Sequence, residues 1–138
     1  MHENDKYPGV PERIQLMDEN GTVHEHPTYS RYIEDVNADT LREAYRLMYT
    51  TRRFDDEATA LQRQGQLALW VPSRGQEAAQ IGSALACAPN DYIFPSYREH
   101  AVALARGVDF RDLITIFRGS TTHGWDMKAH NFHTYTKV

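Results

Sequence analysis

Hydrophobic residues recur at helical intervals along much of the chain. The longest such stretch is 40–64, where Leu41, Tyr45, Met48 and Tyr49 follow one another three or four residues apart and so share a face. Three shorter helices are predicted downstream: 76–87, 97–106 and 110–118. The chain is therefore predicted to be mostly helical beyond residue 37.

Polar residues and glycines mark the predicted helix ends. Thr40 and Glu43 have the capping-box spacing, in which the hydroxyl caps the first turn and the carboxylate bonds back to it. Gly65 is the expected left-handed stop of the long helix, because glycine adopts positive φ at little cost. Asp109 is the expected N-cap of the last helix, and Gly119 its expected end.

Two short apolar runs, 67–71 and 92–95, are the strand candidates, and a proline closes each. Two strands make a poor sheet for a self-contained domain. The missing strands are the main structural question that the sequence raises.

Residues 1–37 differ in composition from the remainder. They hold three of the six prolines and eight acids against three bases, a net charge of −5, whereas the remainder holds eleven acids and twelve bases, a net charge of +1. Within them 14–24 resembles a small hairpin, because Asn20-Gly21 supplies the positive φ of a tight turn. We expect 1–37 to form an extended acidic arm, solvated or in contact with a basic partner.

Composition narrows the class of protein. The near-neutral body of the chain argues against nucleic-acid binding, which requires a basic face. No apolar run approaches the roughly 18 residues of a membrane span, and the polar N-terminus lacks the features of a secretory signal or transit peptide. The single cysteine, Cys87, lies in an apolar run, so we expect a buried structural thiol in a cytoplasmic protein.

The candidate chemistry lies at Tyr97 and Arg98, directly after the run 92–95. If they open a helix, their hydroxyl and guanidinium place two donors where the helix N-terminus already favours an anion. The alternative is a surface packing pair, but ligands gather after the strands of open α/β sheets, which favours a phosphate site. Glu99 or His100 could also approach a ligand, although an exposed helix face is the simpler expectation for Glu99.

Three other groupings are interpreted as structural. The segment Gly75-Gln76-Glu77-Ala78 suits ordinary helix initiation, with an acid in the first turn. The charges of 52–57 are expected to form ion pairs on a solvated or interface face. His123, His130 and His133, with Asp126, follow the last helix without any sign of convergence, so we expect no metal site.

Several motifs follow one another in order: Arg63-Gln64-Gly65-Gln66, Gly75-Gln76-Glu77-Ala78, Ile81-Gly82-Ser83-Ala84, Asn90-Asp91, Tyr97-Arg98-Glu99-His100 and Arg106-Gly107. Together they make residues 41–138 resemble the start of the alpha subunit of thiamine-diphosphate-dependent 2-oxo acid dehydrogenases. These enzymes are the decarboxylating first components of the pyruvate and branched-chain 2-oxo acid dehydrogenase complexes.

The resemblance implies a thiamine-diphosphate-binding α/β fold, a parallel sheet with flanking helices, of which 38–138 is the mostly helical N-terminal part. It implies that Tyr97 and Arg98 bind the cofactor's diphosphate and that no catalytic residue lies in this chain. The implied reaction is oxidative decarboxylation of a 2-oxo acid, pyruvate or a branched-chain acid, with acyl transfer to a lipoyl group. The implied partners are a beta subunit, within a heterotetramer, and the lipoyl-bearing acyltransferase. Trp70 is expected near the pocket for the substrate side chain.

The sequence departs from the family in one respect. The family holds Mg²⁺ with a Gly-Asp-Gly motif followed by an asparagine, and this sequence contains no Gly-Asp-Gly. We therefore expect a truncated subunit that keeps half of the diphosphate site, lacks the metal ligands and is inactive alone. The alternative is a non-catalytic module whose helices 40–64 and 76–87 dock on a beta subunit without binding cofactor.

Overall fold

A computed structural model describes residues 13–118, which divide into two units at residues 37 and 38. In the first unit an antiparallel bridge joins Met17 and Val23 across the turn predicted at Asn20-Gly21. Gly21 has a φ of +82°, and its N–H donates to the carbonyl of Asp18 at 3.1 Å. The short 3-10 helix η2 (Ser30–Tyr32) follows.

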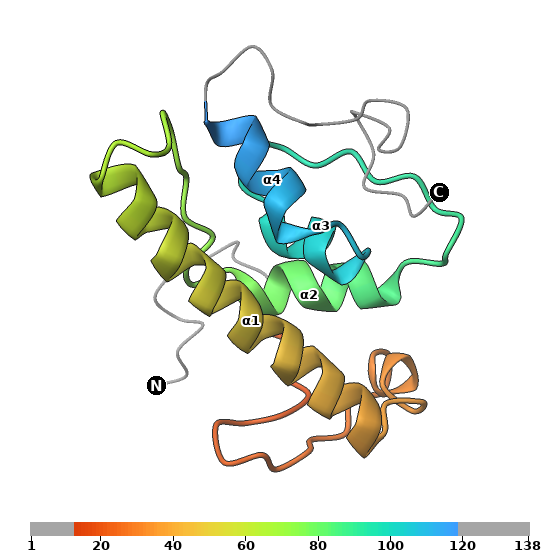
Figure 1. Cartoon of the computed structure of the whole chain (residues 1–138). Coiled ribbons are helices and arrows are strands. Elements are labelled where there is room, and N and C mark those ends of the chain that lie inside the picture. The colour runs from red at the N-terminus through yellow and green to blue at the C-terminus, as the bar shows by residue number, and fades with distance from the viewer. Residues whose placement is uncertain (1–12, 119–138) are drawn as a thin grey trace, which may run out of the picture. The chain divides into compact units, whose positions relative to one another are not determined.

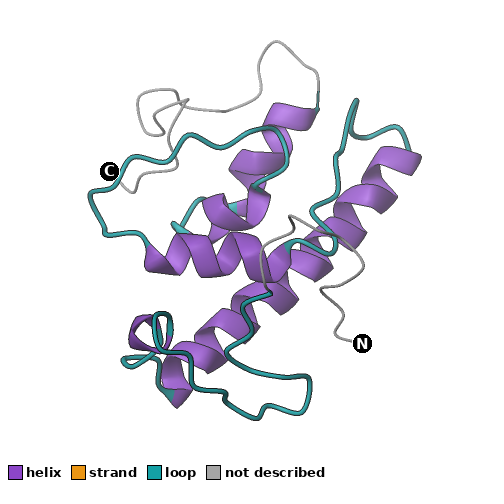
Figure 2. Cartoon of the chain, turned by 180° about the vertical axis from the view of Figure 1, so that it is seen from behind, coloured by secondary structure: helices purple, strands orange, loops and turns teal. Residues whose placement is uncertain are grey.

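The second unit contains four helices in its described part (Figures 1 and 2): α1 (Ala38–Arg63), α2 (Glu77–Ala86), α3 (His100–Ala105) and α4 (Phe110–Phe117). The long helix α1 is the platform of this unit, because both α2 and α3 pack against it and against each other. The predicted predominance of helix after residue 37 is confirmed for the described residues.

Helix α1 begins earlier than predicted. It starts at Ala38, so Thr40 lies inside its first turn and the predicted capping box is wrong. The carboxylate of Glu43 instead accepts two hydrogen bonds from Arg46, at 2.6 and 2.7 Å. The predicted stop is confirmed: Gly65 has a φ of +73°, and its N–H and that of Gln66 bond back to carbonyls of the last turn.

The two shorter helices after residue 95 illustrate one wrong start and one correct one. Helix α3 begins at His100, three residues later than predicted, because the N–H of Ser96 bonds to the carboxylate of Glu99 and the chain bends there. Helix α4 begins after Asp109, whose side chain accepts the N–H of Arg111 at 2.7 Å, so the predicted cap is confirmed. Its predicted end, Gly119, lies outside the described residues.

The two strand candidates are extended loops. No strand occurs within residues 13–118 (Figure 2), so both predicted strands are wrong in this structure. The segment 67–71 is held instead by the end of α4, since the carbonyl of Phe117 accepts the N–H of Ala68 at 2.9 Å. A parallel sheet therefore stays a prediction.

The core of the second unit has two clusters. The larger joins α1, the loop before α2 and helices α3 and α4; its buried members are Phe54, Ala58, Leu67, Trp70, Ala103, Val108 and Leu113. The smaller lies where α1, α2 and α3 meet and consists of Leu47, Ile81 and Ala101.

The expectation of a buried thiol just after α2 is corrected. Cys87 is only partly buried, and its Sγ contacts the carbonyl of Ser83 at 3.2 Å. Within α2, Gly82 is exposed and has no neighbour within 4 Å of an added Cβ.

Candidate functional site

Tyr97 and Arg98 lie in the bend between Pro95 and α3, outside any helix. The prediction that they open a helix is therefore wrong, because α3 begins only at His100. What the structure does bring together is the pair itself: the guanidinium carbon of Arg98 lies 5.6 Å from the ring centroid of Tyr97.

The polar groups of this pair are largely available. Tyr97 is 66% exposed, and its hydroxyl has no hydrogen-bond partner among residues 13–118. Nη1 of Arg98 donates to the carbonyl of Pro72, but no carboxylate in the described part of the chain pairs with this guanidinium. An arginine has five N–H donors, so most of them stay open to an anion.

The backbone of the bend is fixed from two directions. On its own segment, the carboxylate of Glu99 accepts the N–H of Ser96 at 2.6 Å. Burial raises the pKa of Glu99, but hydrogen bonds from Ser96 and the nearby backbone outweigh it and leave the pKa below its usual value. From α2, Gln80 reaches the carbonyl of Arg98 at 3.3 Å and the N–H of Ala101 at 3.1 Å.

His100 belongs to the core. It is 2% exposed, its ring stacks on Trp70 with centroids 4.5 Å apart, and its Nε2 lies 3.0 Å from the carbonyl of Val71. Because a carbonyl only accepts, Nε2 carries the proton. Burial lowers the pKa of His100, so the ring is neutral and structural. Approach of His100 to a ligand is not supported.

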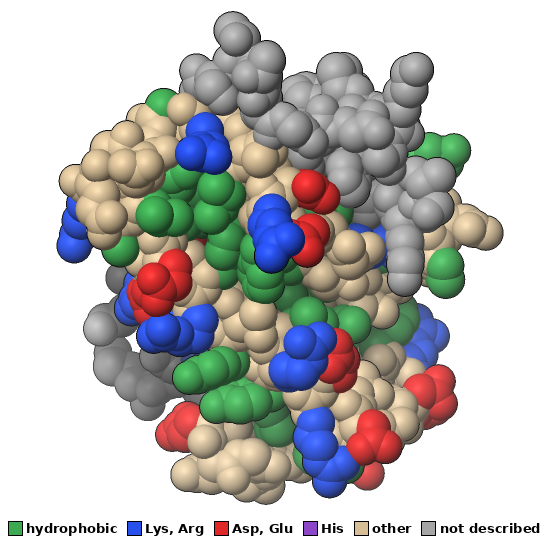
Figure 3. Space-filling model, in the orientation of Figure 1, with side chains coloured by type: hydrophobic (Ala, Val, Ile, Leu, Met, Phe, Trp, Pro, Cys, Tyr) green, Lys and Arg blue, Asp and Glu red, His purple; other side chains and the backbone are tan. Residues whose placement is uncertain are grey.

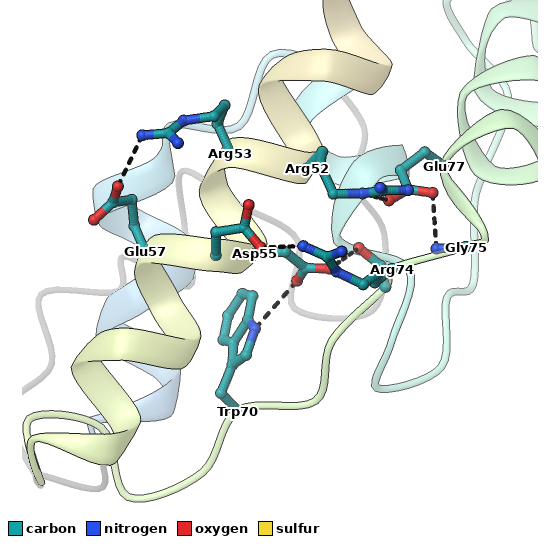
Figure 4. Close-up of polar contacts among 10 residues, drawn as sticks. Arg52, Arg53, Asp55, Glu57, Trp70, Arg74, Gly75 and Glu77 are labelled. Carbon is teal, nitrogen blue, oxygen red and sulfur yellow. Dashed lines mark hydrogen bonds and ion pairs between the residues drawn. The ribbon is translucent and has the colours of Figure 1, made fainter.

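Asp55 anchors the loop that precedes α2 (Figure 4). It is 2% exposed, and its carboxylate accepts the indole N–H of Trp70 at 3.1 Å and the hydroxyl of Ser73 at 3.2 Å. Of the two alternatives expected for the charges of 52–57, a solvated or an interface face, the solvated one is therefore wrong for Asp55. Trp70 is 3% exposed and packs edge-on against Phe54, so it is a core residue in this structure.

A second anchor joins α1 to the start of α2. Arg52 pairs with Glu77, whose other oxygen accepts the N–H of Gly75 at 2.8 Å (Figure 4). The Arg52 hydrogen bond is the main reason that the pKa of Glu77 falls to about 2. Gly75 has a φ of +89°, as expected for a tight entry into the helix.

The ion pairs of 52–57 lie within α1, between α1 and the loop before α2, and between α1 and α2. Only Arg53 and Glu57 form the expected pair within the helix, at 3.0 Å. Asp56 pairs with Arg74 across to the loop. Sequence reasoning missed these loop contacts, although Asp55 follows the buried Thr51 by four residues and precedes the buried Ala58 by three. That helical spacing places Asp55 on the buried face of α1 and could have identified its carboxylate as buried.

No group of three or more metal-ligating side chains occurs within residues 13–118. The residues considered above as a possible metal site lie outside the described residues: His123, Asp126, His130 and His133. In the same described part, no helix combines the length and hydrophobicity needed to cross a bilayer.

The arrangement is suited to holding an anion. The hydroxyl of Tyr97 and the guanidinium of Arg98 have no carboxylate partner among the described residues. The bend that carries them is hydrogen-bonded to α2 and to the loop 70–75. Such donors bind and orient a phosphate group by charge-assisted hydrogen bonds.

Comparison with known proteins places this segment in a family. Residues 45–137 match the family described as "Dehydrogenase E1 component". "3-Methyl-2-oxobutanoate dehydrogenase subunit alpha" of Mycobacterium tuberculosis (strain H37Rv) is 46% identical over 114 residues, covering 82% of this chain and 30% of the relative. "Pyruvate dehydrogenase E1 component subunit alpha" of Staphylococcus aureus (strain Mu50) is 33% identical over 108 residues, covering 78% and 28%. The chain thus spans less than a third of these relatives, and it belongs to the dehydrogenase E1 component family.

Proposed function

We propose that this chain is part of the alpha subunit of a thiamine-diphosphate-dependent 2-oxo acid dehydrogenase. The whole enzyme decarboxylates a 2-oxo acid and transfers the acyl group to a lipoyl group. The observation that carries the proposal is the Tyr97–Arg98 pair: two donors without an acidic partner in the described residues, within a segment that matches the family.

The pair fits a diphosphate. A diphosphate carries several strong acceptor oxygens and negative charge, and it requires donors whose charge no carboxylate already neutralises. Tyr97 offers an exposed hydroxyl, and Arg98 keeps most of its N–H groups open. Both are presented on one bend, so a single anion can meet them together.

The role of this chain is to bind and orient the cofactor. When bound, thiamine diphosphate supplies the decarboxylation chemistry. Tyr97 and Arg98 hold its diphosphate, and Glu99 and the loop at Pro72 keep the bend and the guanidinium in place. The sequence contains no Gly-Asp-Gly, so we assign no Mg²⁺ ligand to residues 1–138.

The names of the relatives support a proposal for the partners and the substrate. We propose a beta subunit, a lipoyl-bearing acyltransferase and the parallel α/β sheet of the thiamine-diphosphate-binding fold as the context in which this segment acts. One relative is named for 3-methyl-2-oxobutanoate and another for pyruvate, with identities of 46% and 33%. A branched-chain 2-oxo acid is therefore the first substrate to test, with pyruvate second.

Arg98→Ala tests the cofactor site. In a full-length subunit assembled with its beta partner, we expect this change to weaken thiamine diphosphate binding by about 100-fold, since a hydrogen-bonded charge pair contributes roughly 1.5–3 kcal/mol. Isothermal titration calorimetry in the presence of Mg²⁺ measures the dissociation constant.

Arg106→Ala is the matched control. Arg106 also carries a guanidinium, but it donates to the carbonyls of Ala88 and Pro89 at 3.0 and 2.8 Å. Its loss should loosen the turn before 92–95 and change cofactor affinity much less. Equal losses of affinity in the two variants would argue against the role assigned to Arg98.

A further inference from the structure

Gln80 connects α2 to the bend that carries Tyr97 and Arg98. The residue is 6% exposed, and its side-chain amide is bonded at both ends: Nε2 donates to the carbonyl of Arg98 at 3.3 Å, and Oε1 accepts the N–H of Ala101 at 3.1 Å. These partners fix the orientation of the amide, because a carbonyl requires a donor and an N–H requires an acceptor.

The amide therefore spans the point at which the loop becomes α3. One end holds the last carbonyl before Glu99 and His100, and the other holds the first turn of the helix. Nε2 also donates to Oε1 of Gln76 at 3.1 Å, so the side chain is tied to its own helix as well. A rigid helix thus determines where the backbone of Arg98 lies.

The guanidinium of Arg98 is held separately. It donates to the carbonyl of Pro72, and the adjacent Ser73 bonds to the buried Asp55. The side chain of Arg98 thus has one support and its backbone another. Gln80 is the support that a side-chain substitution can remove.

We propose that Gln80 is a positioning residue for the diphosphate site: it touches no ligand itself and sets the place of Tyr97 and Arg98 through the carbonyl of Arg98. The inference rests on the proposed function, because it needs Tyr97 and Arg98 to hold a diphosphate. It goes further in assigning a buried residue of α2 to the geometry of that site.

The test separates positioning from general stability by comparing two ligands. Thiamine diphosphate and thiamine differ only in the diphosphate. The dissociation constant of thiamine divided by that of thiamine diphosphate therefore reports the contribution of the donors at the bend. Destabilisation of the whole subunit weakens the binding of both ligands and leaves that ratio unchanged. The measurements use the full-length subunit with its beta partner and Mg²⁺, and thermal unfolding is recorded in parallel.

Two substitutions of Gln80 are informative. Gln80→Met keeps the length of the side chain and removes its three hydrogen bonds, to Gln76, Arg98 and Ala101. Gln80→Glu keeps an acceptor for Ala101 and loses the donor toward Gln76 and Arg98. We expect each to reduce the ratio about tenfold, which corresponds to the loss of a typical hydrogen bond. Ser83→Ala, an exposed change on the same helix, should leave the ratio unchanged.

The outcomes are distinguishable. If Arg98→Ala reduces the ratio but Gln80→Glu retains the wild-type value, Gln80 is only structural and this inference is overturned while the proposed function stands. If Arg98→Ala leaves the ratio unchanged, the proposed diphosphate site itself is wrong. Should Gln80→Met fail to fold, a wild-type ratio in Gln80→Glu still overturns the inference, because this variant preserves the shape of the side chain and its contact with Ala101 but lacks the donor toward Arg98.

Discussion

At the scale of single residues, Asp55 has the role least expected from its position in the sequence. It stands among charged neighbours on α1, yet its carboxylate is buried and accepts hydrogen bonds from Trp70 and Ser73. A buried carboxylate is tolerated only when donors replace its water. The indole and the hydroxyl supply that replacement, and in doing so they fix the loop 70–73 that receives Arg98.

Glu77 gives a pH-dependent prediction at the same scale. Its pKa is lowered from 4.5 to about 2, chiefly by the Arg52 hydrogen bond. Because the pKa is lower in the folded state, the carboxylate stabilises the fold above pH 4.5, and this stabilisation is lost as the pH falls toward 2. We expect the urea midpoint to fall across that interval.

Glu77→Gln should lower the urea midpoint near neutral pH and make the midpoint depend less on pH in the acidic range. Glu57→Gln is the matched control, because Glu57 pairs with Arg53 at the exposed surface and such pairs contribute about 0–1 kcal/mol. Tryptophan fluorescence reports unfolding, since Trp70 is buried. A Glu77→Gln protein with the wild-type acid dependence would contradict this account.

At the scale of elements, the helices end where local chemistry stops them, and they pack where their apolar faces meet. Gly65 ends α1 with positive φ, and Asp109 begins α4 through its side chain. Leu113 is then fully buried, with Phe110 and Phe117 packed against the larger core cluster. The helix predicted at 110–118 is thus confirmed as α4 (Phe110–Phe117).

Two glycines give opposite predictions. Gly65→Ala forces an alanine to a φ of +73° and should destabilise the fold by about 1 kcal/mol. Gly82→Ala replaces an exposed glycine inside α2, where an added Cβ meets nothing within 4 Å, and should stabilise it by roughly 0.5–1 kcal/mol. Urea unfolding measures the change in the free energy of unfolding for both variants. If both changes had the same sign, helix termination would not explain the glycine at position 65.

At the scale of the whole molecule, much apolar surface in the second unit is uncovered. Between α1 and α4, Phe54, Phe110 and Ile114 line a groove of about 600 Å³, and hydrophobic side chains are visible there in Figure 3. Three aromatic residues of the loop before α3 are largely exposed: Tyr92 at 72%, Phe94 at 76% and Tyr97 at 66%. Exposed patches of this kind mark surfaces that other protein segments cover.

Residues 1–138 alone are therefore expected not to bind thiamine diphosphate at micromolar concentrations, even with Mg²⁺. In the proposed function Tyr97 and Arg98 hold only the diphosphate, and the sequence has no Gly-Asp-Gly to which the metal can be assigned. Calorimetry on the 138-residue chain tests this, with a full-length subunit and its beta partner as the positive control. Micromolar binding by the chain alone would contradict the division of the site.

Signals that act over a few residues were readable without the structure. Helical periodicity, the glycine stop at Gly65 and the cap at Asp109 were sufficient for most of the helices. The order of the motifs was sufficient to identify the family, because motif order is read from the sequence and does not depend on how the helices pack. The same motifs singled out Tyr97 and Arg98, whose role in binding a diphosphate stays a prediction and whose predicted place in a helix is wrong.

Contacts between distant segments required the tertiary structure. The environment of Arg98 depends on the carbonyl of Pro72 and on the side chain of Gln80. These partners lie up to 26 residues apart, and their hydrogen bonds exist only after the helices have packed. Burial of Asp55 has the same cause: a charge follows the local pattern of a solvated face until a loop folds over it and supplies the donors.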